Sequence, residues 1–73
     1  PMPVEHQVVS IFAANNGFFD GKEIGEIKEI EKKLLAFMET VKRPILDEIA
    51  KGEWSDEIEN VLKESLNEFK KGV

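Results

Sequence analysis

Cysteine is absent from this sequence, and histidine occurs only once among its 73 residues. Without cysteine there are none of the disulfide bonds that hold many small secreted domains together. A single histidine without a thiol also cannot supply the usual tetrahedral shell of a zinc site. We therefore expect neither a disulfide framework nor a metal site in these residues, and a reducing compartment is the simpler expectation.

Long apolar runs and excess positive charge are missing as well. No run approaches the roughly 20 apolar residues that a membrane-spanning helix needs, and no basic segment precedes an apolar stretch as in a secretory signal. Acidic residues outnumber basic ones, 15 to 10, for a formal net charge of −5. Nucleic acids and anionic membranes are bound by clustered basic residues. We expect no nucleic-acid partner and no direct membrane insertion.

The length of the chain allows one domain at most. A domain of this size buries only about 60% of the surface that its unfolded form exposes, so we expect marginal stability. The first residue is Pro1 rather than methionine. This start predicts that the sequence begins inside a longer polypeptide or after processing.

The spacing of apolar residues predicts an all-α fold, a small bundle of about four helices without strands. The first helix is expected over residues 3–15, because Pro3 suits a first turn and Asn15, Asn16 and Gly17 supply a stop. Its apolar face is expected to consist of Val4, Val8, Ile11 and Phe12, widened by Val9 and the alanines. Phe18 and Phe19 follow directly, and at least one of them should fill a core or an interface.

The second helix is expected over residues 23–41. A continuous apolar stripe supports it, formed by Ile24, Ile27, Ile30, Leu34, Phe37, Met38 and Val41. Pro44 interrupts the pattern and predicts a boundary near residues 42–44. A short third helix over residues 44–51 should end at Gly52, and a fourth over residues 56–71 should begin after the N-cap Ser55.

No catalytic, cofactor-binding or metal-binding residue is predicted. A phosphate loop is absent, because no glycine-rich segment leads into lysine and Ser/Thr. Residues 20–31 match a calcium loop at Asp20, Gly25 and Glu31, but Lys22 and Ile24 stand where oxygen ligands belong. A turn leading into an amphipathic helix is the expected structure of this segment.

His6 beside Glu5 would suit a general base, and Ser10 lies one helical turn away. The alternative is a polar residue in an exposed first turn, which we favour because no complete set of nucleophile, base and orienting group can be assembled.

Trp54 and the acidic residues each leave two interpretations open. Trp54 can anchor an interface, or it can pack near Ile58 at the start of the last helix, which is favoured. The acidic residues can face a basic partner or simply be solvated. They are Asp47, Glu48, Glu53, Asp56, Glu57, Glu59 and Glu64.

The whole sequence resembles the C-terminal helical domain of the α subunit of F-type rotary ATP synthases. The first stretch is similar to that family's pattern PM-x-V-x-x-Q-V-x-x-[IL]-x-A, which ends in a glycine, an aromatic residue, one more residue and an aspartate. The matching residues there are Pro1, Met2, Val4, Gln7, Val8, Ile11, Ala13, Gly17, Phe18 and Asp20. Later matches are Ile30-Glu31, Leu34-Leu35, Pro44, Leu46, Glu48-Ile49, Gly52, Leu62, Leu66, Phe69 and Lys70. Pro3 departs from a frequent serine, and Ile30 from a frequent phenylalanine.

The resemblance implies a non-catalytic structural and coupling segment of a proton-translocating ATP synthase, not an enzyme on its own. It implies a place at the membrane-facing end of the αβ hexamer, beside the β subunits and the γ rotor shaft, with the bacterial ε subunit as a further partner. That place is on the cytoplasmic face of the inner membrane or in the equivalent organelle compartment. No cofactor is implied within this segment, since MgATP or MgADP binds the central domain of such subunits.

The resemblance also implies that the helices preceding Pro1 in that domain are missing, so the domain would be incomplete and part of its apolar surface uncovered. The competing hypothesis is a free-standing helical interaction module that binds an amphipathic partner helix in a groove. It predicts a monomer with a cooperative melt.

Overall fold

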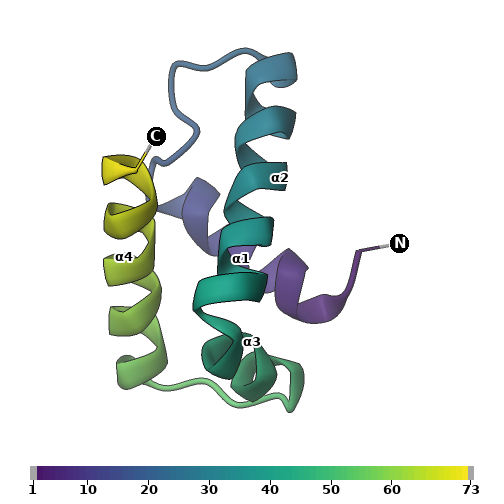
Figure 1. Ribbon diagram of the computed structural model, residues 1–73, viewed down its shortest axis with the longest axis vertical. Helices are drawn as coiled ribbons and strands as arrows, with labels where there is room; N and C mark the ends of the chain where they lie inside the picture. The colour runs from purple at the N-terminus through teal and green to yellow at the C-terminus, as the bar shows by residue number, and fades with distance from the viewer. Residues whose placement is uncertain (1, 73) are drawn as a thin grey trace.

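The computed structural model describes residues 2–72, and Pro1 and Val73 lie outside the described residues. Four helices form its described part: α1 (Val4–Asn15), α2 (Ile24–Val41), α3 (Arg43–Ala50) and α4 (Asp56–Lys71), as Figure 1 shows. No strand occurs within residues 2–72. The all-α prediction is confirmed, and each helix end lies within one residue of its expected position.

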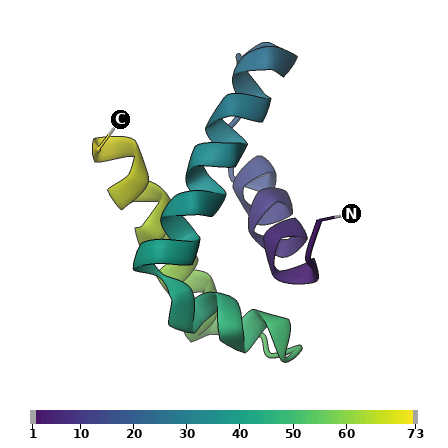
Figure 2. The same ribbon diagram turned by 45° about the vertical axis from the view of Figure 1, so that its right-hand side comes forward.

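The helices are arranged around α2. In Figure 1, α2 and α4 lie side by side and run in opposite directions, and Figure 2 shows α1 crossing on the other side of α2. The short α3 closes one end of the bundle and contacts both α1 and α2. The core therefore lies between α2 and the three helices that surround it.

Gly17 ends α1 as the sequence predicts. It adopts a φ of +75°, which an L side chain rarely tolerates. The N–H of Gly17 donates to the carbonyl of Ala14 at 3.1 Å, and the N–H of Phe18 donates to the carbonyl of Ala13 at 3.0 Å. This pair of bonds is a Schellman motif, which turns Phe18 into the core, where its side chain is buried.

The other predicted boundaries have equally local causes. The hydroxyl of Ser55 accepts a hydrogen bond from the N–H of Ile58 at 3.2 Å and caps α4. Pro44 lies in the first turn of α3, where its missing N–H removes no helical bond. Gly52, with a φ of +86°, ends α3 in the same way that Gly17 ends α1.

All four helices contribute to one hydrophobic core. Leu34 and Met38 of α2 lie at its centre, with no exposed side-chain surface. The buried apolar residues are Val9, Ala13, Phe18, Leu34, Leu35, Met38, Leu46, Ile49, Ile58, Leu62 and Leu66.

The predicted apolar stripe of α2 is wrong at both of its ends. Ile24 is 74% exposed and Val41 is 57% exposed. The first turn of α2 extends past the neighbouring helices (Figure 2), and Val41 is the last residue before the junction with α3. A period of three to four residues predicts a direction around the helix axis, but not how far along that axis neighbours cover the helix.

The predicted apolar face of α1 is buried only in part. Val9 and Ala13 are the buried residues of this helix, whereas Val4 and Ile11 are exposed and Val8 and Phe12 are half-buried. The helix is apolar around most of its circumference, so its periodicity does not distinguish the side that α2 and α3 cover. The other side remains uncovered.

Candidate functional site

An uncovered apolar area lies on α1 and the connector before α4. We call it the α1–Trp54 surface, and it consists of Val4, Val8, Ile11, Phe12 and Trp54. Val4, Val8 and Ile11 share one face of α1 because they are spaced by four and three residues. Ile11 is 60% exposed and Trp54 is 50% exposed.

The two aromatic rings give this surface its shape. Phe12 and Trp54 meet edge to face, with ring centroids 6.0 Å apart and an interplanar angle of 62°. Together with Val8, Ile11 and Asn15 they line a shallow hollow of about 360 Å³. All five members of the surface are uncharged, although about a third of the sequence is charged. Contiguous exposed apolar surface of this kind marks interaction sites.

His6 is bound to an acidic side chain of α2. Its Nε2 donates to Oε2 of Glu39 at 2.6 Å, and the other oxygen of Glu39 accepts from Arg43. Arg43 Nε in turn donates to Oδ1 of Asp47 at 3.2 Å. This network joins α1, α2 and α3. The expectation of an exposed polar residue is wrong, because the His6 side chain is only 19% exposed and is held by Glu39.

Ser10, the candidate nucleophile, lacks a base. Its Oγ is buried and has no hydrogen-bond partner within residues 2–72. A serine attacks only when an adjacent base accepts its proton, and neither ring nitrogen of His6 forms a hydrogen bond with Ser10 Oγ in the described part of the chain. The described residues therefore assemble no nucleophile and base pair around Ser10.

The unpartnered hydroxyl of Ser10 leads to a stability prediction. Ser10→Ala should raise the free energy of unfolding by about 1 kcal/mol, because a buried hydroxyl without a partner costs free energy that alanine does not. Ser65→Ala is the matched control. Ser65 is fully buried, but its Oγ donates to the carbonyl of Val61 at 2.7 Å. Urea denaturation should show no gain for Ser65→Ala, and equal effects of the two changes would contradict this interpretation of Ser10.

The segment that resembles a calcium loop is divided between a turn and a helix. Asp20 lies in the turn, but α2 begins at Ile24, so Glu31 is one of its helical residues. The fifth to ninth positions of the calcium-loop pattern are therefore helical as well, and Lys22 and Ile24 offer no side-chain oxygen at its third and fifth positions. Within residues 2–72, no group of three or more histidine and acidic side chains is placed to hold a metal ion.

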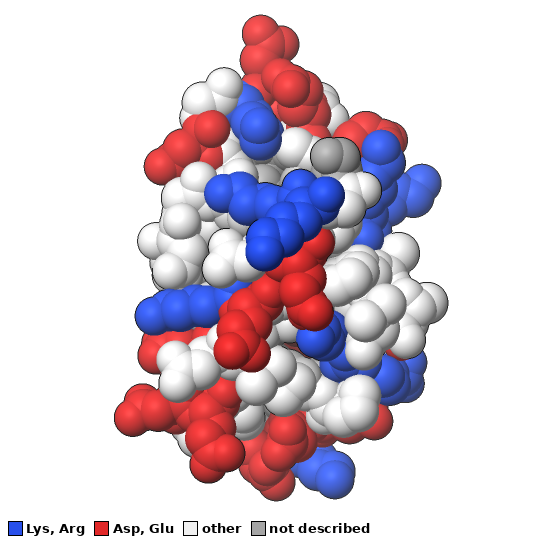
Figure 3. Space-filling model, turned by 60° about the vertical axis from the view of Figure 1, so that its left-hand side comes forward, with Lys and Arg blue, Asp and Glu red and all other residues white. Residues whose placement is uncertain are grey.

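Trp54 packs within the fold and also stays half-exposed, so both interpretations of it stay open. Its ring packs against Phe12 of α1, a contact that sequence spacing does not predict, and half of its surface remains exposed. On the face drawn in Figure 3, acidic and basic side chains interleave. Asp47, for example, pairs with Arg43.

Sequence reasoning missed the joining of α1 and Trp54 into one surface. A signal was present, because α1 carries more apolar residues than a single buried stripe requires. The contribution of Trp54 depends on the path of the connector after α3, which no periodicity reports.

Among residues 2–72, no helix combines the length and apolarity needed to cross a membrane.

Comparison with known proteins agrees with the resemblance found in the sequence. Over residues 1–69 the chain matches the family described as ATP synthase alpha/beta chain, C terminal domain. It is 41% identical over 73 residues to ATP synthase subunit alpha of Mycobacterium sp. (strain KMS), covering 99% of this chain and 13% of that protein.

It is also 41% identical over 71 residues to ATP synthase subunit alpha of Alcanivorax borkumensis, covering 96% of this chain and 14% of that protein. The chain thus spans about one seventh of the length of these relatives. No solved structure matches it significantly. On the family match and these identities, the protein belongs to the family formed by the C-terminal domains of ATP synthase alpha and beta subunits.

Proposed function

We propose that the chain is a non-catalytic structural and coupling segment of an ATP synthase α-type subunit, at the membrane-facing end of the αβ hexamer. The observation that carries this proposal is the α1–Trp54 surface, which is apolar, uncharged and uncovered. A small domain gains nothing by exposing such a surface to water, and it gains stability when a partner covers it. The relatives indicate that this partner is the rest of the same subunit, since most of their length lies outside the matched segment.

Under this proposal, the rest of the same subunit packs on the α1–Trp54 surface. The remaining partners are neighbouring β subunits, the γ rotor shaft and the ε subunit. MgATP or MgADP binds in the central domain, not in this segment. The protein acts in a peripheral complex on the cytoplasmic face of the inner membrane, or in the equivalent organelle compartment, during proton-coupled ATP synthesis.

A chimeric subunit tests the proposal. In ATP synthase subunit alpha of Alcanivorax borkumensis, the matched segment is replaced by residues 1–73 of this protein. We expect the chimera to assemble with the other subunits and to support ATP-driven proton pumping. Assembly is measured by native mass spectrometry, and pumping by acidification of inverted membrane vesicles.

Two substitutions in the chimera test the surface itself. Ile11→Glu should reduce assembly by about tenfold or more, because burying a carboxylate against apolar groups costs several kcal/mol. Asn60→Glu is the control, since it introduces an acidic group in place of a neutral one at an exposed position of α4. Asn60→Glu should leave assembly unchanged.

Two results would contradict the proposal. Assembly of Ile11→Glu at the level of the unsubstituted chimera would mean that the α1–Trp54 surface is not buried against the subunit. Failure of the unsubstituted chimera to assemble, together with a monomeric protein that melts cooperatively on its own, would favour the free-standing interaction module.

A further inference from the structure

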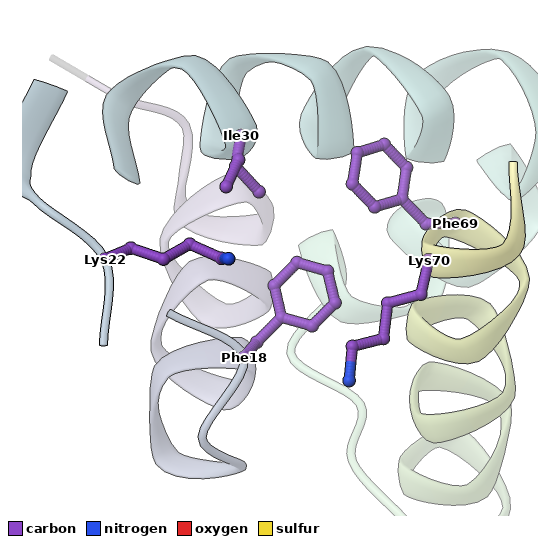
Figure 4. Close-up of a pocket in the computed structure, with 5 residues that line it drawn as sticks. All are labelled: Phe18, Lys22, Ile30, Phe69 and Lys70. Carbon is purple, nitrogen blue, oxygen red and sulfur yellow. The ribbon is translucent and has the colours of Figure 1, made fainter. Parts of the chain in front are cut away.

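A second hollow lies between the connector that precedes α2 and the last turns of α4. It has a volume of about 200 Å³ and is lined by Phe18, Lys22, Ile30, Phe69 and Lys70. Figure 4 shows Phe18, Lys22, Ile30 and Phe69 pointing toward one another from the connector, α2 and α4, with Lys70 running alongside the Phe18 ring. We call it the two-lysine pocket. It shares no residue with the α1–Trp54 surface.

The walls of the two-lysine pocket are apolar and held in place by the core. The ring centroids of Phe18 and Phe69 are 5.9 Å apart, and those of Phe69 and Phe37 are 5.7 Å apart. Phe18 is only 8% exposed and is positioned by the Schellman motif that ends α1. The walls are therefore largely preformed, which lowers the cost of binding a guest.

Two ammonium groups border this apolar space. Lys70 Nζ lies 5.7 Å from the centroid of the Phe18 ring, and in Figure 4 Lys22 reaches toward the pocket from the other side of that ring. Neither lysine makes an ion pair within residues 2–72, whereas Lys42 pairs with Glu68 at 2.6 Å. Both ammonium groups are thus available to a negatively charged guest.

The size of the pocket limits what that guest can be. Sites for drug-sized ligands have volumes of about 300–1,000 Å³, so this pocket is too small for such a molecule. Its volume suits one aromatic or branched aliphatic side chain. The two lysines add a requirement for negative charge on both sides of that apolar group.

We propose that the two-lysine pocket binds an acidic segment of a partner protein, which inserts one apolar side chain between flanking carboxylates. The apolar group packs on Phe18, Ile30 and Phe69, and the carboxylates pair with Lys22 and Lys70. This inference goes beyond the proposed function and does not depend on it, because it rests on the pocket alone.

A second copy of the protein is the main competing occupant. Trp54 is half-exposed and lies between Glu53 and Asp56, so it has the required chemistry. However, its ring already packs against Phe12, and a second copy would have to break that contact. The experiment below separates the two occupants.

The test is a titration of the isotope-labelled 73-residue protein with capped pentapeptides, followed by amide and methyl NMR spectra. The probe peptide has phenylalanine between two pairs of glutamates. One control peptide has glutamine in place of every glutamate, and the other has alanine in place of phenylalanine. Each titration is repeated at several concentrations of the protein.

We expect saturable shifts centred on Phe18, Ile30, Phe69 and Lys70 with the probe peptide. Both control peptides should bind about tenfold more weakly or worse, because each lacks one half of the recognition. Lys22→Glu combined with Lys70→Glu should weaken binding of the probe peptide by about tenfold. Lys32→Glu combined with Lys51→Glu makes the same charge change at exposed lysines that do not line the pocket, and should alter binding by less than about twofold.

Three results would overturn the inference. Absence of shifts at the pocket, or equal binding of the glutamine peptide, would exclude recognition by the two lysines. Equal losses of peptide affinity in the Lys22/Lys70 and the Lys32/Lys51 double variants would show that the peptide is attracted nonspecifically by positive charge. Shifts that grow with protein concentration in the absence of peptide and vanish in Trp54→Ala would identify a second copy as the occupant.

Discussion

Replacement of Leu34 by alanine is expected to lower the free energy of unfolding by about 2–5 kcal/mol. Leu34 lies in the middle of α2 with no exposed surface, at the point where the surrounding helices meet. The change removes buried methyl groups and leaves a cavity that the neighbouring helices cannot fully close. A domain of this size has only a few kcal/mol of stability, so the variant should be largely unfolded at room temperature. Urea denaturation followed by circular dichroism measures the effect.

Ile24→Ala is the control for this prediction. Ile24 belongs to the same helix and to the same predicted apolar stripe, but it is 74% exposed. Its removal should change the free energy of unfolding by no more than about 0.5 kcal/mol. Comparable losses for the two variants would mean that the first turn of α2 is as buried as its middle.

Gly17→Ala is expected to destabilise the protein by about 1–2 kcal/mol. The φ of +75° at Gly17 forces any Cβ close to its own backbone. The new methyl group would also lie 3.0 Å from Oδ2 of Asp20, although this flexible carboxylate can move away. The backbone strain is therefore the larger cause, and it acts on the turn that places Phe18 in the core.

Gly25→Ala is expected to raise the stability of the protein, in contrast to Gly17→Ala. Gly25 lies in the first turn of α2, without a positive φ, and an added Cβ would meet nothing within 4 Å. Alanine is the better helix former by about 0.5–1 kcal/mol, so this variant should be more stable. Thermal melts of the two variants should move in opposite directions. A loss of stability in Gly25→Ala would show that this turn needs the freedom of glycine.

The helix boundaries could be predicted from the sequence because each has a local cause. Ser55, Gly17 and Gly52 act through hydrogen bonds or dihedral angles within a few residues. The inner face of α1 could not be predicted in the same way. Val9 and Ile11 are both apolar, and only the position of α2 and α3 decides that Val9 is buried and Ile11 exposed.

The candidate sites were harder to predict, because each combines distant parts of the sequence. The contact between Phe12 and Trp54 depends on the path of the connector after α3. The two-lysine pocket joins Lys22 of one connector to Lys70 in the last turn of α4. Neither pair has a characteristic spacing, so only the folded arrangement brings its members together. By contrast, the match to the family needed no such contact, because it depends on residue types in order along the sequence.

Under the proposed function, the two apolar sides of α1 would give this helix a mechanical role. Its inner side packs through Val9 and Ala13, and His6 bonds to Glu39, whose other oxygen holds Arg43 at the start of α3. A partner segment bound to its outer side would therefore contact a helix that is already held by α2 and α3. A shift or rotation of that partner segment would move α1 as a rigid unit. The displacement would then reach α2 and α3 instead of being absorbed by bending of α1. The helix would then transmit force between the subunit and the bundle.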